Sequence, residues 1–263
     1  MHDINNCRCM KQASVSCLKL INSKLTLILV AIASLLFITT MNISAEEYVP
    51  AKTIRFGEKQ KVKGQWRATA YHLHEVGDYF FETSELPAKI CFSEIQNPKT
   101  AACHEAKGVN DFPFQEVTDL KLVLLDKSRT KYGVLFTAQH HGATIGKTKY
   151  ISIWVFKEES KGFANLLEKT AITDQGEFKI YSSLIGKSGY FILADRIWDS
   201  KTETLYAPHY YEISIFKLHE SKYEFVSKYK TSKKYNSLDN TTRINVIDPE
   251  KQNIIKVLKQ IGD

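Results

Sequence analysis

Short runs of β-branched and aromatic residues recur along most of the chain. Each run is about six residues long and is bounded by clusters of Gly, Pro, Asn, Asp, Ser or Lys, which is the pattern of β-strands separated by turns. The long 3.6-residue periodicity of an amphipathic helix is absent. The pattern therefore predicts an all-β fold.

The order of these runs contains an internal repeat. The motif Ile-Ser-Ile-Trp at 151–154 returns as Ile-Ser-Ile-Phe at 213–216, 62 positions later. The same shift carries Phe163 onto Phe225 across a polar turn in both copies. We interpret each copy as one supersecondary unit of four antiparallel strands, the last two forming a long hairpin.

The two repeats span about 114–172 and 178–231, and a weaker hairpin at 90–95 and 101–105 precedes them. Four-stranded units placed side by side are typical of propeller blades, so we expect a small or incomplete β-propeller-like fold. A β-sandwich or a closed β-barrel built from the same hairpins is the alternative. The expected strands of the repeats are 114–125, 132–139, 150–157 and 163–172, then 178–184, 190–198, 210–218 and 222–231.

The C-terminal segment has two interpretations. Residues 246–258 (VIDPEKQNIIKVL) resemble a strand-turn-strand phrase of bacterial surface propellers, and this resemblance implies shape alone. A helix is the alternative, with Asp248 as its N-cap and Pro249 at the first helical position. The repeat favours the hairpin.

The N-terminal segment has the layout of a secretory signal. Four basic residues precede an uncharged apolar run at 25–40, and small residues ending at Ala45 follow it. The run is shorter than the about 20 apolar residues of a comfortable membrane span. We expect cleavage after Ala45, with retention as an anchor as the alternative. A polar arm or edge strand at 46–64 and one all-β domain at 65–263 would follow.

Loss of residues 1–45 changes the charge and the cysteine content of the chain. The remaining 218 residues carry a net charge of +4, so a large part of the basic balance lies in the leader and we expect no nucleic-acid partner. The body keeps two cysteines, Cys91 and Cys103, which would pair in an oxidising compartment and add about 3 kcal/mol of stability. Two unpaired buried thiols are the alternative. We therefore expect a periplasmic or secreted protein without a membrane span after cleavage.

Two loops carry residues with metal-binding chemistry. If the repeats stack, His140, His141, Asp195 and His209 would emerge on the same rim, where imidazole and carboxylate groups suit zinc or manganese. Solvated loop histidines and an ion pair within 195–199 are the competing interpretation. We find no HExxH motif, G-x-S-x-G motif or glycine-rich phosphate loop, so we assign no catalytic residue and no cofactor beyond this divalent metal.

A basic and aromatic stretch at 222–235 offers a binding surface. Five lysines alternate there with aromatic residues, a composition that can hold an anionic strand by charge and stacking. The alternative is an exposed strand edge kept soluble by its lysines. The predicted surface comprises Arg196, Trp198, Asp199, Tyr210, Lys228, Tyr229, Lys230, Lys233, Lys234 and Tyr235.

These features favour a binding or interaction module of the cell envelope without enzymatic activity, such as an inhibitor or immunity-like protein. Its partner would be another envelope protein or an anionic envelope polymer. A metal-dependent hydrolase with a site on the loop rim is one alternative. A structural subunit that needs a partner to complete an envelope assembly is another.

Overall fold

The computed structural model describes residues 48–73, 86–128, 130–140, 148–167, 171–174, 176–199, 204, 207–236 and 244–262. The predicted leader lies outside them. Among the described residues, no helix is both long enough and apolar enough to cross a membrane.

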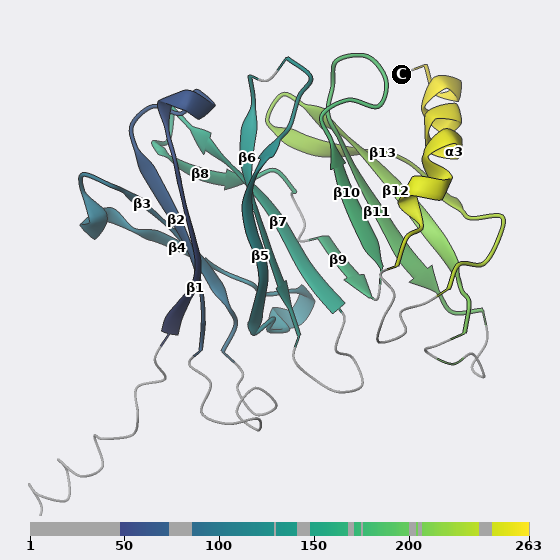
Figure 1. Ribbon diagram of the computed structural model, residues 1–263, viewed down its shortest axis with the longest axis horizontal. Coiled ribbons are helices and arrows are strands. Elements are labelled where there is room, and N and C mark those ends of the chain that lie inside the picture. Colours follow the sequence, from purple (N-terminus) through teal and green to yellow (C-terminus); the bar gives the residue numbers. More distant parts are fainter. Residues whose placement is uncertain are drawn as a thin grey trace, which may run out of the picture. The chain divides into compact units, whose positions relative to one another are not determined.

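Three open antiparallel sheets, each following the order of the chain, make up the fold (Figure 1). The first sheet contains β1 (Tyr48–Phe56), β2 (Trp66–Leu73), β3 (Lys89–Glu94) and β4 (Ala102–Glu105). The middle sheet contains β5 (Glu116–Leu124), β6 (Tyr132–Gln139), β7 (Thr148–Lys157) and β8 (Gly162–Asn165), with β9 (Ala171–Asp174) paired to β7. The last sheet contains β10 (Glu177–Tyr181), β11 (Tyr190–Ile197), β12 (Tyr210–His219) and β13 (Lys222–Lys230). Three 3-10 turns, η1 (Glu58–Gln60), η2 (Pro98–Thr100) and η3 (Val109–Asp111), and one helix, α3 (Ile247–Gln260), complete the described elements.

The prediction of an all-β fold built from repeated four-stranded antiparallel units is confirmed. The two predicted repeats correspond to the middle and last sheets, and β6 begins and ends where its hydrophobic run does. The first sheet is a third unit of the same kind, of which the sequence pattern predicted the β3–β4 hairpin. The arrangement fits both a propeller-like arc and a layered sandwich.

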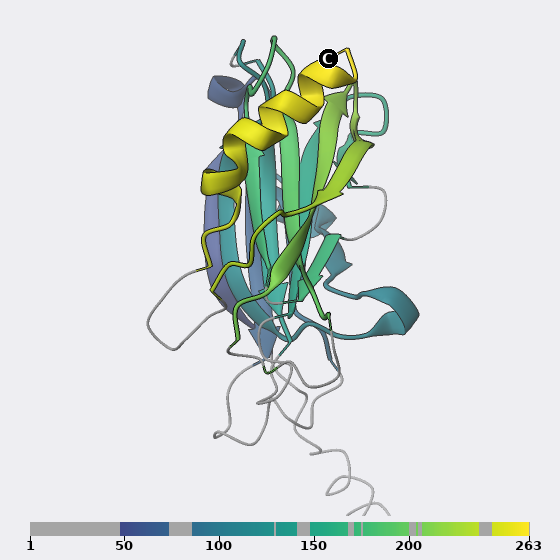
Figure 2. The same ribbon diagram turned by 90° about the vertical axis from the view of Figure 1, so that its right-hand side faces the viewer.

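The three sheets stack face to face, with one apolar cluster in each interface (Figures 1 and 2). Phe92 of the first sheet and Phe136 of the middle sheet belong to one cluster, whereas Leu135 and Phe191 belong to the cluster between the middle and last sheets. Neighbouring residues of a strand point to opposite faces. The middle sheet is thus covered on both faces, which explains why its central strands β6 and β7 are almost continuously apolar.

Helix α3 covers the outer face of the last sheet (Figure 2). Its residues Ile254 and Leu258 are fully buried against Tyr190, Ile213 and the other apolar residues of that face. The prediction of a C-terminal hairpin and the resemblance to a propeller phrase are therefore wrong. The start signals at 248–249 and the i, i+4 spacing of buried residues favour a helix, and these local preferences prevail over the repeat.

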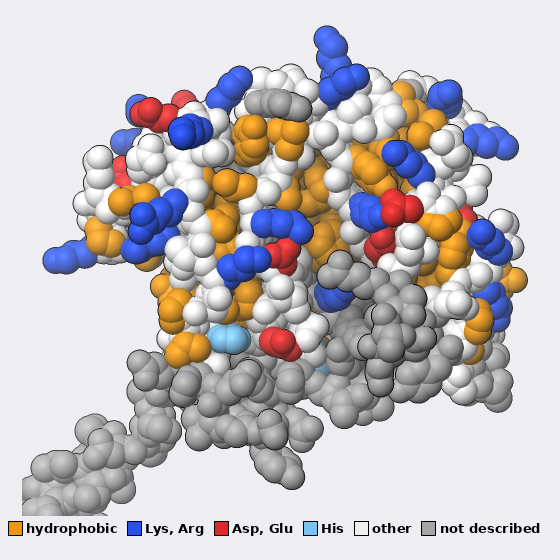
Figure 3. All heavy atoms as spheres, viewed as in Figure 1, with side chains coloured by type: hydrophobic (Ala, Val, Ile, Leu, Met, Phe, Trp, Pro, Cys, Tyr) orange, Lys and Arg blue, Asp and Glu red, His pale blue; other side chains and the backbone are white. Residues whose placement is uncertain are grey.

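Basic side chains are spread over the face of the molecule seen in Figure 3, where they alternate with hydrophobic bands and a few acidic groups. One of the ion pairs joins two sheets, because Lys52 of β1 lies 2.5 Å from Asp119 of β5. Partial burial alone would raise the pKa of Asp119, but hydrogen bonds and charge from Lys121 and Lys52 hold it below its usual value. The pair therefore favours contact between the first and middle sheets near neutral pH.

Candidate functional site

Cations and aromatic rings gather at one end of the last sheet. The guanidinium carbon of Arg196 lies 3.9 Å from the ring centroid of Trp198, a side chain that is 44% exposed. The Nζ atoms of Lys230 and Lys234 lie 4.3 and 5.2 Å from the ring centroid of Tyr210. We call these five residues the cationic–aromatic cluster. Arg196, Tyr210 and Lys230 lie on β11, β12 and β13, and Trp198 and Lys234 follow β11 and β13, so sheet pairing brings both cation–aromatic groups to the same end of the sheet. The two groups lie on opposite faces, because Arg196 pairs with the buried Tyr211 and Lys230 pairs with Glu212.

Acidic residues hold two lysines of this region in place. Lys230 Nζ lies 2.9 Å from Asp199 Oδ1, and Lys228 Nζ lies 3.0 Å from Glu212 Oε2. All four side chains are one third or more exposed, and such pairs contribute about 0.2–1 kcal/mol each. An anionic ligand can therefore displace either carboxylate at small cost. Lys233 lies nearby with its Nζ 5.1 Å from the ring centroid of Tyr235.

Two residues of the predicted surface, Tyr229 and Tyr235, point toward helix α3. The hydroxyls of Tyr229 and Tyr235 donate hydrogen bonds to the Glu250 carboxylate of α3, at 3.1 and 2.5 Å. Burial, followed by the negative charge of Glu250 and the hydrogen bond to it, raises the pKa of Tyr229. Both tyrosines therefore help to dock α3, and the alternation of Tyr229 with Lys228 and Lys230 along a strand was the signal for this division.

The predicted metal ligands have separate surroundings. His209 is fully buried, with Nε2 2.9 Å from the carbonyl oxygen of Thr204 and its ring 5.0 Å from that of Trp198. His140 Nδ1 lies 3.2 Å from the carbonyl oxygen of Pro113.

Asp195 lies on β11 opposite Glu212 of β12. In the part of the chain that the structure describes, no three His, Cys, Asp or Glu side chains form a group able to hold a metal ion. His141 lies outside the described residues, so the metal site stays a prediction.

Cys91 and Cys103 lie directly opposite each other on β3 and β4, with Cα atoms 4.0 Å apart and sulfurs 1.98 Å apart. This is a disulfide distance, in the hairpin that the sequence pattern predicted. The pair ties the edge strand β4 to the rest of the first sheet.

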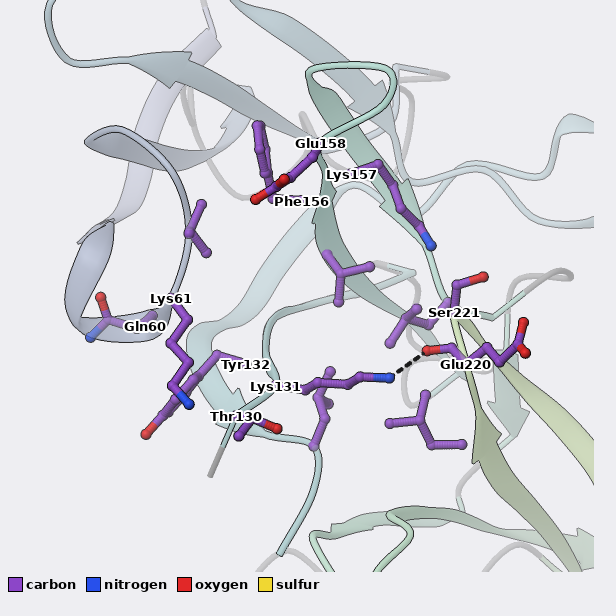
Figure 4. A pocket seen from close by; sticks show the side chains of 15 residues that line it. Gln60, Lys61, Thr130, Lys131, Tyr132, Phe156, Lys157, Glu158, Glu220 and Ser221 are labelled. Atoms are coloured by element: carbon purple, nitrogen blue, oxygen red, sulfur yellow. Dashed lines mark hydrogen bonds between the residues drawn. The ribbon is translucent and has the colours of Figure 1, made fainter. Parts of the chain in front are cut away.

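Turns from all three sheets meet around a pocket of about 210 Å³ (Figure 4). Its apolar lining includes Leu125 and Leu218, and its polar lining includes three lysines. Lys131 donates a hydrogen bond from Nζ to the carbonyl oxygen of Glu220, at 2.8 Å, which joins the β5–β6 turn to the β12–β13 turn. Lys157 reaches toward the same turn in Figure 4. We call this small cavity the rim pocket, and the hydrogen bond of Lys131 bridges it.

A larger hollow opens between the first and middle sheets, which we call the aromatic groove. Its volume is about 690 Å³, and Trp66, Phe92, Phe156 and Phe163 provide its aromatic wall. It shares Phe156 and Glu158 with the rim pocket, so the two hollows adjoin. Sequence reasoning missed this groove because its rings come from strands of two different sheets.

Comparison with known protein families, with curated proteins and with solved structures returns no match. Function is therefore argued from the geometry of these surfaces.

Proposed function

We propose that this protein is an exported binding module of the cell envelope, periplasmic or secreted, which acts without catalysis. Its cationic–aromatic cluster would bind an anionic envelope polymer. The observation that carries the proposal is that two cation–aromatic groups, Arg196 with Trp198 and Lys230 and Lys234 with Tyr210, lie at the same end of the last sheet.

The geometry of the cluster suits a repeating anion. Lys228 and Lys230 are two residues apart on β13, so they project from the same face of the strand at a spacing of about 7 Å. The polymer's charges would replace the weak contacts to Glu212 and Asp199, while the exposed ring of Trp198 supplies a stacking surface. A polymer engages several such contacts together, which raises its overall affinity.

The proposed location outside the cytosol rests on the leader pattern and on the cysteine pair. Disulfides persist in oxidising compartments and are rare in the cytosol, and Cys91 and Cys103 are at disulfide distance. Both features support export, and the absence of a recognised catalytic motif supports a binding role over an enzymatic one.

A charge-reversal experiment tests the proposal. In Lys228→Glu/Lys230→Glu/Lys234→Glu we expect binding to immobilised polyphosphate and sulfated dextran to fall about 10- to 100-fold, since each lysine near an anionic surface contributes about 1 kcal/mol. Neutral dextran is the ligand control. The matched control variant, Lys127→Glu/Lys256→Glu/Lys259→Glu, makes the same change in charge at exposed sites elsewhere.

Equal losses in the two triple variants would show that net charge alone drives binding and would refute the proposed site. If neither polymer binds but the wild-type protein captures an acidic envelope protein, the ligand class is wrong.

A further inference from the structure

We infer that the aromatic groove is a second binding site, and that its ligand is an uncharged oligosaccharide. The groove shares no residue with the cationic–aromatic cluster, so this inference stands apart from the proposed function. It rests on three features of the groove: rigid rings, a balanced charge and a suitable size.

The rings of the groove are fixed before any ligand arrives. Phe163 stacks on Phe92 with centroids 4.0 Å apart, and Trp66 lies 5.1 Å from Phe163 and 5.2 Å from Phe156. The indole Nε1 of Trp66 donates a hydrogen bond to the carbonyl oxygen of Lys63, at 2.9 Å, which fixes the orientation of the ring. Phe92 is 1% exposed and supports the other rings from the core, so the partly exposed rings of Trp66, Phe156 and Phe163 are the ones that can contact a ligand. Rigid aromatic surfaces bind at low cost in side-chain entropy, and their apolar faces suit the C–H faces of a sugar ring.

The rim of the groove is polar with no net charge. Lys63 and Lys161 oppose Glu94 and Glu158, and none of these four side chains forms an ion pair within the described residues. They offer both donors and acceptors of hydrogen bonds. An anionic ligand would meet the two carboxylates, a cationic ligand would meet the two lysines, and an apolar ligand would leave all four charges without partners.

A saccharide satisfies this rim because each hydroxyl group both donates and accepts. A proline-rich peptide, the other chemistry that aromatic grooves recognise, offers carbonyl acceptors and no N–H at proline, so the carboxylates of Glu94 and Glu158 would lack donors. The volume of about 690 Å³ lies within the range of small-molecule sites. It is sufficient for a short oligosaccharide, and the adjoining rim pocket leaves one end of the groove open to a longer chain.

The test uses the purified full chain and three neutral tetrasaccharides: cellotetraose, chitotetraose and maltotetraose. Titration calorimetry should detect binding of at least one of them by the wild-type protein. We expect Trp66→Ala to weaken this binding at least tenfold. Because Trp66→Ala removes a packed ring, Glu94→Gln/Glu158→Gln provides a second variant that keeps the shape of the rim, and it should weaken binding at least threefold.

Trp198→Ala removes an exposed indole on the last sheet and is the matched control, with no expected effect on the tetrasaccharides. Lys228→Glu/Lys230→Glu/Lys234→Glu should also leave their binding unchanged, which separates this site from the cationic–aromatic cluster. Three outcomes would overturn the inference: no tetrasaccharide binds at millimolar concentration, binding survives both groove variants, or the groove binds a proline-rich peptide instead.

Discussion

At the scale of single residues, Asp126 organises the turn between β5 and β6. Its carboxylate accepts hydrogen bonds from the hydroxyls of Ser128 and Thr130, both at 2.6 Å, and from the backbone N–H groups of Thr130 and Lys131. Partial burial opposes ionisation, but these four donors lower the pKa of Asp126 to about 2. The turn that presents Lys131 to the rim pocket is therefore built around one ionised carboxylate.

This arrangement predicts a defined dependence of stability on pH. The pKa of Asp126 is lower in the folded than in the unfolded protein, so its stabilising contribution is complete above about pH 4 and is lost as the pH falls to about 2. Solvent screening at this partly exposed site reduces the effect to about 1 kcal/mol. Asp126→Asn should lower the free energy of unfolding in urea by that amount at pH 7 and by nearly nothing at pH 2. A difference from wild type that stays constant over this range would contradict the assignment; Glu159→Gln is the exposed control.

At the scale of elements, α3 is docked by two carboxylates. Glu177 of β10 accepts hydrogen bonds from the backbone N–H groups of Val246 and Ile247, at 2.7 and 2.9 Å, at the positive end of the helix dipole. Glu250, which is 2% exposed, accepts from Tyr229, Tyr235 and the side-chain amide of Asn253. These contacts fix the position of the helix on the last sheet, beyond what its apolar face can specify.

Removal of the Glu250 carboxylate should therefore be costly. Glu250→Ala leaves the hydroxyls of Tyr229 and Tyr235 without their acceptor in a half-buried site, and we expect the free energy of unfolding to fall by about 3 kcal/mol. Denaturation in urea measures it. Glu105→Ala, which removes an exposed carboxylate paired with Lys107, should leave the stability almost unchanged. A cost for Glu250→Ala as small as the control's would show that apolar contacts alone hold the helix.

The elements differ in how far the sequence predicts them. Strands β6 and β11 lie within one residue of their predicted bounds, 132–139 and 190–198, because their length and turns are decided locally. Strand β1 was harder to identify because Pro50 and Lys52 break the alternation in its first half, where the pairing with β2 shifts register. The alternative of a C-terminal helix was right in kind, but its N-cap is Val246, two residues before the predicted N-cap Asp248. The hairpin interpretation failed because a repeat in sequence does not require a further repeat at its end.

The two candidate sites also differ in how far the sequence predicts them. The residues of the cationic–aromatic cluster lie on strands that the repeat had already aligned, so sequence reasoning brought most of them together. The aromatic groove depends on the contact between two sheets, where Trp66 and Phe92 meet Phe156 and Phe163. No periodicity within one strand encodes that contact, because stacking is decided by the shape of complete faces.

At the scale of the whole molecule, the outer faces of the first and last sheets, which end the stack, are made compatible with water in different ways. The outer face of the last sheet is apolar and is covered by α3. The outer face of the first sheet is largely polar: Thr53 lies opposite Thr69 and Arg55 opposite Arg67, while Ile90 and Phe92 face the core. A stack of repeated units needs end faces that tolerate water, and both ends meet this requirement.

This argument predicts a monomer, in contrast to the alternative of a structural subunit that needs a partner to complete its sheets. Light scattering coupled to size-exclusion chromatography should give the mass of a single chain at micromolar concentrations. A chain truncated after residue 245 loses α3 and exposes Tyr190, Ile192, Ile213 and Ile215 on one face, so we expect it to associate or precipitate. The double variant Ile254→Asp/Leu258→Asp, which disrupts the same contact without shortening the chain, should behave similarly. A wild-type protein that forms stable oligomers with α3 in place would contradict the argument, since at least one outer face of the stack would then bind another chain.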